Sequence, residues 1–324
     1  MNTIVFADSF HMVSSAEERI ASLGKILRFS LEERDDLLAA SPDADIIVAE
    51  YASVDERLLR GCNRLKGIVV YGVGVNHIDL ETASAMGIPV ANSRGGNAEA
   101  VAELSVSLML ECFRSTGRAD RFVRSGAWNA ADSASLPLWM KGRELKGKTL
   151  GILGPGAIGG RIADLGEAFG MRVIVWGGRS SSTRRETVPL DELLSTSDIV
   201  SVNIPRTEST LGLLSREKLS LMKKGGILIA TSRGGIVDET ALSEMLHSGH
   251  IGGAGLDVFA SEPLPEHSPL ISAPNTVFTP HMGGSTEEAV ENISHIIADC
   301  CEKLLEGMIP ETIVNAGLLR EKGF

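Results

Sequence analysis

The chain has 324 residues, of which 43% are hydrophobic, and a formal net charge of −11 at pH 7. This length and apolar content suit two globular domains with sizeable cores. The negative charge disfavours binding to nucleic acid or to anionic membranes through bulk electrostatics. The sequence has no basic N-terminal region followed by an apolar one and no apolar run long enough to span a membrane, so we expect a soluble cytoplasmic protein.

The cysteines do not have the spacing of a metal site. None of the four forms a C-x-x-C pair; they are Cys62, Cys112, Cys300 and Cys301. Adjacent cysteines on an expected helix are more often buried thiols than ligands. We therefore expect neither a disulfide nor a bound metal.

Short apolar runs alternate with helical patterns over residues 1–95. The expected strands are 4–7, 26–29, 45–49 and 67–70, and the expected helices are 14–23, 30–40 and 54–59. We expect Ser14 to cap the first of these helices and Ser30 to open the second. This alternation is typical of an α/β domain with a parallel sheet.

The last of these strands runs into a glycine-rich loop, Gly72-Val73-Gly74. Open α/β sheets bind ligands at the carboxyl ends of their strands, and the N–H groups of such a loop suit a small anion. A plain strand-to-helix turn has the same pattern, and the loop alone favours that simpler interpretation.

A long helix is expected over residues 98–113, preceded by Asn97, and it could link two domains. Residues 115–148 then break the α/β rhythm. They carry several arginines and two isolated tryptophans, Trp128 and Trp139. An irregular arm with exposed aromatic side chains is typical of a subunit contact.

Residues 149–176 have the pattern of strand, glycine turn, helix and strand. Gly154, Gly156 and Gly159 give G-x-G-x-x-G: the first permits a tight turn, the second lets a pyrophosphate approach the backbone, and the third allows close helix packing. With 35 glycines in the chain, such a spacing also arises by chance. The flanking strands and the amphipathic helix between them nevertheless favour dinucleotide binding.

The same rhythm continues beyond Trp176, with strands expected at 199–204, 226–231, 253–258 and 276–279 and helices at 190–196, 215–223 and 238–248. A long helix over 285–305 could return the chain to the first domain. Four polar residues stand at expected strand ends: Arg233, Asp257, Glu262 and His281. Each alone could be structural, but together at one sheet edge they indicate an active site.

These segments together resemble the D-isomer-specific 2-hydroxyacid dehydrogenase family. The motifs are Gly72-Val-Gly-Val, Asn97 with Val101-Ala-Glu103, the glycine motif, Arg233-Gly-Gly-Ile-Val-Asp238, Leu256-Asp-Val-Phe-x-x-Glu-Pro263 and Pro280-His-x-Gly-Gly284. The resemblance implies two Rossmann-like or flavodoxin-like parallel-sheet domains. A discontinuous substrate domain, 1–96 plus 286–324, would enclose a dinucleotide-binding domain, 97–285, with a dimerisation arm near 115–148 and a homodimeric assembly.

The resemblance also implies roles for the polar residues. His281 would be the proton donor to the substrate keto oxygen, Glu262 its carboxylate partner, and Arg233 the residue that binds the keto oxygen and carboxylate of a 2-oxo acid. The backbone of Gly72, Val73 and Gly74 would hold the substrate. The implied cofactor-binding residues are Val101, Gly154, Gly156, Ala157, Ile158, Gly159, Gly178, Arg179, Ser180, Asn203, Pro205, Thr231, Ser232, Arg233, Asp257, His281 and Gly283.

The end of the second strand of the motif distinguishes NAD from NADP. An acidic residue there would bind the ribose hydroxyls and repel a 2′-phosphate. This chain has no acidic residue between Trp176 and Glu186, and it has Arg179, Arg184 and Arg185 instead. We therefore expect NADP(H) to be preferred over NAD(H).

Family members with such a basic loop resemble glyoxylate and hydroxypyruvate reductases, so we expect an enzyme that reduces a small 2-oxo acid to the D-2-hydroxy acid. NAD-dependent D-2-hydroxyacid or phosphoglycerate dehydrogenase is an alternative, and Arg94 could add an anion contact. Formate dehydrogenases resemble one another in a glutamine at the position of Glu262. The glutamate in this chain therefore disfavours formate oxidation. A cofactor-sensing corepressor that binds protein partners is the alternative of another class.

Overall fold

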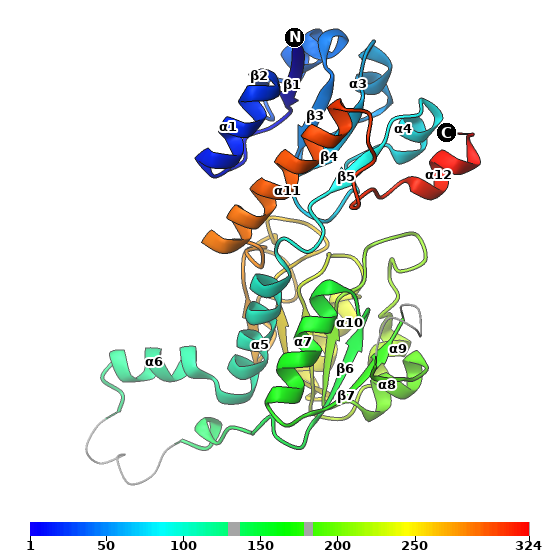
Figure 1. Ribbon diagram of the computed structural model, residues 1–324. Coiled ribbons are helices and arrows are strands. Elements are labelled where there is room, and N and C mark those ends of the chain that lie inside the picture. The colour runs from blue at the N-terminus through cyan, green and yellow to red at the C-terminus, as the bar shows by residue number, and fades with distance from the viewer. Residues whose placement is uncertain (129–136, 178–183, 324) are drawn as a thin grey trace. The chain divides into compact units, whose positions relative to one another are not determined.

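The computed structural model describes residues 1–128, 137–177 and 184–323, which form two compact units (Figure 1). Unit 1 consists of Met1–Ala98 and Ser285–Phe324, and unit 2 of Glu99–Gly284. Unit 1 contains a five-stranded sheet and unit 2 a seven-stranded sheet, and every strand pair in both is parallel. The expected fold class of two parallel-sheet α/β domains is therefore confirmed.

The sheet of unit 1 has the strand order β2-β1-β3-β4-β5. Its strands are β1 (Asn2–Phe6), β2 (Gly24–Arg28), β3 (Ile46–Ala49), β4 (Gly67–Val70) and β5 (Val90–Asn92). Its helices are α1 (Ser14–Leu23), α2 (Arg34–Ala40), α3 (Glu56–Gly61), α4 (Leu80–Ala85), α11 (Glu287–Leu305) and α12 (Ala316–Glu321). Ile46 and Val48 pack into one core and Ile47 and Ala49 into the other, which explains why β3 is continuously apolar.

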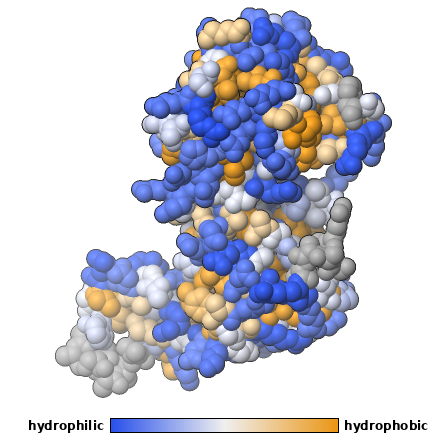
Figure 2. All heavy atoms as spheres, viewed as in Figure 1, coloured by the Kyte–Doolittle hydropathy of each residue, from blue (hydrophilic) through white to orange (hydrophobic). Residues whose placement is uncertain are grey.

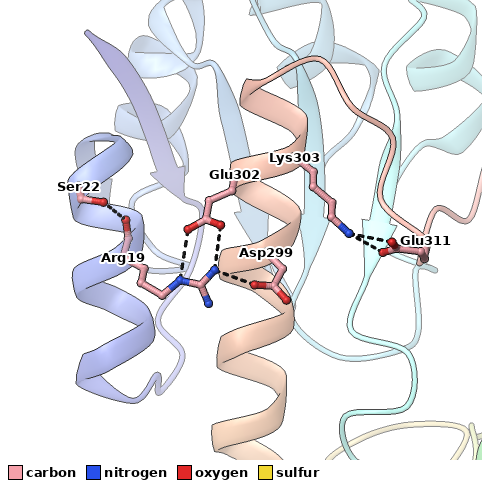
Figure 3. A network of polar contacts seen from close by, with 6 residues as sticks. All are labelled: Arg19, Ser22, Asp299, Glu302, Lys303 and Glu311. Atoms are coloured by element: carbon pink, nitrogen blue, oxygen red, sulfur yellow. Dashed lines mark hydrogen bonds and ion pairs between the residues drawn. The ribbon is translucent and has the colours of Figure 1, made fainter.

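An N-terminal and a C-terminal segment of the chain lie together in unit 1, where α1 packs against α11. Arg19 binds Asp299 at 2.7 Å and Glu302 at 2.9 Å, as Figure 3 shows. Because these side chains are more than a third exposed, each pair contributes only about 0–1 kcal/mol. The fully buried Ile20 and Ile297 lie in the same core cluster and hold the two segments together more strongly.

The sheet of unit 2 has the order β12-β11-β10-β9-β6-β7-β8. Its strands are β6 (Thr149–Leu153), β7 (Arg172–Trp176), β8 (Glu186–Thr187), β9 (Ile199–Val202), β10 (Gly226–Ala230), β11 (Ile251–Leu256) and β12 (Thr276–Phe278). Its helices are α5 (Ala98–Arg114), α6 (Thr116–Arg124), α7 (Ala157–Ala168), α8 (Leu190–Thr196), α9 (Arg216–Ser220) and α10 (Glu239–His247). After β6 the chain adds β7 and β8 on one side of this strand and then β9 to β12 on its other side. The switch point of this sheet therefore lies between β6 and β9.

The structure differs from the sequence interpretation in three local details. The helix expected from Ser30 begins at Arg34, because Ser30 and Glu33 form a turn in which the Ser30 N–H donates to Glu33 at 2.7 Å. Ser14 is the first residue of α1 and not its cap. The arm expected to be irregular contains α6, whose Phe122 packs edge-on against Trp139 with ring centroids 5.9 Å apart.

The four cysteines are buried free thiols. Within the described ranges no group of three potential metal ligands comes together. Among the same residues, no helix has the length and apolar character needed to cross a membrane.

Two carboxylates lie at the switch point of unit 1, which falls between β1 and β3. Asp8, 3% exposed, follows β1 and accepts the N–H groups of Glu50, Tyr51 and Ala52, the first at 2.9 Å. Glu50 follows β3 and is half-buried. Its burial and the neighbouring charge of Asp8 raise the pKa of Glu50 from 4.5 to about 7. This sheet edge is therefore acidic.

We expect the Glu50→Gln variant to be more stable than the wild type at pH 8 and nearly equal to it at pH 4.5. Because the folded protein binds the Glu50 proton more tightly than the unfolded chain, wild-type stability falls as pH rises from about 4.5 to about 7. After allowance for solvent screening the difference at pH 8 should be about 1–2 kcal/mol. Urea unfolding at both pH values, with the exposed Glu18→Gln as control, measures it. A difference independent of pH would contradict this assignment.

Candidate active site

His281 and Glu262 form a hydrogen-bonded pair in unit 2. His281 Nδ1 lies 2.7 Å from Glu262 Oε2, and the other carboxylate oxygen accepts the N–H of Phe259 at 2.9 Å. Both side chains remain about one-third exposed, at 32% and 36%. With Nδ1 directed at the carboxylate, Nε2 is the ring nitrogen left to meet a ligand.

The backbone of the His281 turn is held by the buried carboxylate of Asp257. One oxygen accepts the Thr279 hydroxyl at 2.6 Å and the Met282 N–H at 2.9 Å, and the other accepts the Gly283 N–H at 2.9 Å. His281 has a positive φ of 51°, a conformation that costs a non-glycine residue free energy and that clusters at functional sites. Asp257 stabilises the turn against that cost.

Arg233 is brought to the same edge by the close approach of two backbone segments. A Cβ on Gly234 would lie 1.7 Å from the carbonyl oxygen of Phe259, so only glycine permits this packing. The Arg233 guanidinium donates to the Ser232 carbonyl at 2.7 Å and the side chain is half-buried. The predicted trio of Arg233, Glu262 and His281 therefore lies in connected segments of one unit.

The glycine motif lies where β6 ends, at the switch point of the sheet. Gly154 has φ +87°, and a Cβ there would lie 2.9 Å from the Asn203 carbonyl oxygen. A Cβ on Gly159 would lie 2.1 Å from the Gly154 carbonyl oxygen, whereas one on Gly156 would meet nothing within 4 Å. Gly154 and Gly159 thus permit close packing, and Gly156 leaves exposed backbone, followed by the exposed Ala157 and the half-buried Ile158, that a phosphate can approach.

Two buried polar atoms near strand ends have no hydrogen-bond partner within the described residues, namely Asn203 Oδ1 and Ser232 Oγ. Buried polar groups normally have partners, so these atoms indicate places where a bound molecule could supply them. The neighbouring Pro205 is exposed, and the buried Thr231 hydroxyl lies 2.9 Å from the Ser105 hydroxyl. Orphaned polar atoms and the open Gly156 together fit a dinucleotide.

Val101 and Gly283 adjoin Asp257. A Cβ on Gly283 would lie 3.0 Å from Asp257 Oδ2 and 3.4 Å from Val101 Cγ2. The predicted cofactor residues on α5, after β11 and in the His281 turn are thus neighbours in the structure.

The specificity region after β7 differs in part from the sequence interpretation. Arg185 pairs with Glu167 at 2.9 Å and with Asp164, and Arg184 pairs with Glu167 at 3.2 Å. The expectation of an available arginine is therefore wrong for Arg185, whose side chain is 9% exposed, whereas Arg184 remains 77% exposed. Gly178, Arg179 and Ser180 lie outside the described residues.

The glycine loop of unit 1 is fixed by the residues that end β5. Gly72 has φ +115°; its N–H donates to Ser93 Oγ at 2.7 Å, and its carbonyl accepts the Ser93 N–H at 2.9 Å. Asn92 donates to the Val73 carbonyl at 2.7 Å. Since the backbone N–H of Gly72 is used internally, we expect its contribution to be the shape of the loop that presents Val73 and Gly74.

Sequence reasoning missed two acidic residues at these edges. Glu50 in unit 1 and Glu239 in unit 2 carry raised pKa values, each caused first by burial. Glu239 directly follows the Arg233–Asp238 motif. Its position at the start of an expected helix, beside the polar end of a strand, could have indicated a role in the site.

Comparison with known proteins identifies the family of the chain. Residues 106–283 match the model of the D-isomer specific 2-hydroxyacid dehydrogenase NAD-binding domain. A glyoxylate reductase of Aeropyrum pernix is 39% identical over 89% of this chain and 88% of its own length. A D-3-phosphoglycerate dehydrogenase of Mycobacterium leprae is 35% identical over 95% of this chain but only 59% of its own length.

Among solved structures, the NADPH-dependent glyoxylate/hydroxypyruvate reductase of Sinorhizobium meliloti, in complex with NADP and malonate, is similar with a TM-score of 0.85. It is 28% identical, and the match covers 97% of this chain and 96% of that chain. The chain therefore belongs to the D-isomer specific 2-hydroxyacid dehydrogenases and is an NAD(P)-dependent oxidoreductase.

Proposed function

We propose that the protein reduces a small 2-oxo acid of the glyoxylate or hydroxypyruvate type to the D-2-hydroxy acid, with NADPH as the preferred cofactor. The observation that carries this proposal is the His281–Glu262 pair at 2.7 Å, next to Arg233 and in the same unit as the open Gly156. Glyoxylate reductases among the relatives support the substrate class.

In this mechanism His281 gives its Nε2 proton to the keto oxygen as the carbonyl is reduced. Glu262 holds the ring through Nδ1 and stabilises the imidazolium by charge. Arg233 binds the keto oxygen and the carboxylate of the substrate, because its guanidinium presents several donors in one plane. When bound, the nicotinamide supplies the hydride.

The cofactor would be held along the carboxyl edge of the unit 2 sheet. Gly154 to Gly159 would bind the pyrophosphate, Asn203 and Ser232 would use their unpartnered oxygens, and Asp257 would orient the nicotinamide carboxamide. Three partners already occupy the Asp257 carboxylate, which has about four acceptor positions, so one position remains for the amide.

Unit 1 would serve as the substrate domain, with the N–H groups of Val73 and Gly74 binding the substrate carboxylate. The acidic pair Asp8 and Glu50 at the same sheet edge disfavours a substrate with a second anionic group.

Arg94, exposed after β5, is a cation at that edge and favours the alternative, an NAD-dependent D-2-hydroxyacid or phosphoglycerate dehydrogenase. A phosphoglycerate dehydrogenase relative supports that second candidate. A cofactor-sensing corepressor would bind cofactor without turnover.

The His281→Gln variant should lose at least about 100-fold in kcat with glyoxylate or hydroxypyruvate, because the proton donor is removed. Its NADPH affinity, followed by fluorescence, should stay within about twofold, since His281 is only one of many proposed cofactor-binding residues and the glycine motif, Asn203 and Asp257 are unchanged. His267→Gln changes an exposed histidine of the same unit and should be fully active. Unchanged turnover in His281→Gln would reject the proposed role, and absence of wild-type turnover with every 2-oxo acid would favour the sensor.

The wild type should show a higher kcat/KM for NADPH than for NADH. Replacing Arg179 with alanine should lower the NADPH value about tenfold and leave NADH unchanged, as expected for loss of one phosphate contact. The matched control is Arg185→Ala, because Arg185 is only 9% exposed and is paired with Glu167. Steady-state kinetics with both cofactors makes the comparison. Equal values or an NADH preference in the wild type would refute the proposal.

We propose that the protein forms a homodimer through the arm of unit 2. In the described part of this arm Val123, Trp128 and Leu138 are 51%, 52% and 90% exposed, and Figure 2 shows hydrophobic surface gathered there. Light scattering should give twice the chain mass of 34.4 kDa, and Val123→Asp with Leu138→Asp should give monomers. Leu31→Asp, on unit 1, should leave the dimer intact. A monomeric wild type would be the contrary result.

A further inference from the structure

Glu239 opens helix α10 next to the predicted catalytic residues of unit 2. Its side chain is half-buried, and Glu239 Oε1 accepts the N–H of Ala260 at 2.6 Å. The preceding N–H in the chain, that of Phe259, donates to Glu262 at 2.9 Å. Two carboxylates are thus bound to successive amides of one turn.

This turn has little freedom to move. The approach of Gly234 to the Phe259 carbonyl fixes it on one side. On the other, Glu239 and Arg233 line one small cavity together with Val237, Leu242 and Val258. The position of Glu239 is therefore tied to both Glu262 and the segment that carries Arg233.

The electrostatics also couple Glu239 to Glu262. Burial raises the pKa of Glu239, the Ala260 N–H opposes that rise, and the negative charge of Glu262 adds to it. A Coulomb interaction acts equally on both partners. Because the Glu239 and Glu262 carboxylates accept from adjacent amides, at 2.6 and 2.9 Å, their charges lie close together in the same turn as the His281 partner.

We propose that Glu239 is a positioning residue that anchors the turn bearing Glu262 and whose negative charge stabilises the proton on the Glu262–His281 pair. This inference rests on the proposed function of that pair. Among the described residues, Glu262 is the charged group that acts on Glu239, Arg233 lines the same cavity, and His281 is hydrogen-bonded to Glu262. On its own helix Asp238 is the cap, and its carboxylate accepts the Ala241 N–H at 2.9 Å.

The proposed role of Glu239 predicts how the pH dependence of both reduction and oxidation changes when its charge is removed. Reduction of the 2-oxo acid needs the proton on the pair, and oxidation of the 2-hydroxy acid needs it absent. Loss of the Glu239 charge should therefore shift both pH profiles in the same direction. A residue that only stabilised the fold would change rates without moving the two midpoints together.

The test is Glu239→Gln, whose amide oxygen still accepts from Ala260 but carries no charge. The midpoints of kcat/KM against pH, for reduction with NADPH and for oxidation with NADP, should both fall by roughly 0.5 pH unit, the size expected for two partly exposed charges. The plateau rates should stay within about twofold. Glu239→Ala also removes the acceptor, so it should show the same shift together with a lower kcat.

Glu244→Gln removes a charge from the exposed part of the same helix and should shift neither midpoint. Midpoints that stay fixed in Glu239→Gln would overturn the proposal, whether or not the plateau rates fall. Equal plateau rates in Glu239→Ala and Glu239→Gln would overturn the anchoring role. Failure of the proposed function gives a different result: His281→Gln would keep its turnover.

Discussion

The geometry of the candidate site depends on one buried carboxylate. Asp257 accepts one hydroxyl and two backbone N–H groups from residues 279–283, and it is 1% exposed. These bonds hold His281 in its left-handed conformation and direct its ring toward Glu262. Without Asp257 the Gly283 N–H would be buried and unpaired, a cost of about 1–3 kcal/mol. The pairing of His281 with Glu262 is thus prepared before any ligand arrives.

Other carboxylates in both units act in the same way, as acceptors for the amides that follow parallel strands. Asp8 binds three successive N–H groups after β3, and Glu262 and Glu239 bind the two consecutive amides of one turn. Charged acceptors make these hydrogen bonds stronger than neutral ones. The result is a set of strand ends whose amides are held by charged acceptors.

Much of this arrangement could be predicted from the sequence, because apolar runs and glycine spacing follow directly from strand burial and backbone geometry. The strand 67–70 and the helix after Gly156 are in place as expected. The start of α2 could not be predicted, because the Ser30–Glu33 turn competes with a helix that the residues themselves permit. The pairing of Arg184 and Arg185 with Asp164 and Glu167 depends on how α7 packs beside β7. Spacing along the chain does not show that contact.

The two sheets have different residues at their switch points, and this difference indicates which unit should bind the dinucleotide. Both are open parallel sheets, and such sheets bind ligands at the switch point of their strand order. In unit 1 that point is filled by Asp8, whose carboxylate already occupies the amides that an anionic phosphate would need, while Glu50 adds a second negative charge. In unit 2 the corresponding loop has Gly156, with nothing within 4 Å of where a side chain would begin. We therefore expect a pyrophosphate to bind at the switch point of unit 2 and not at that of unit 1.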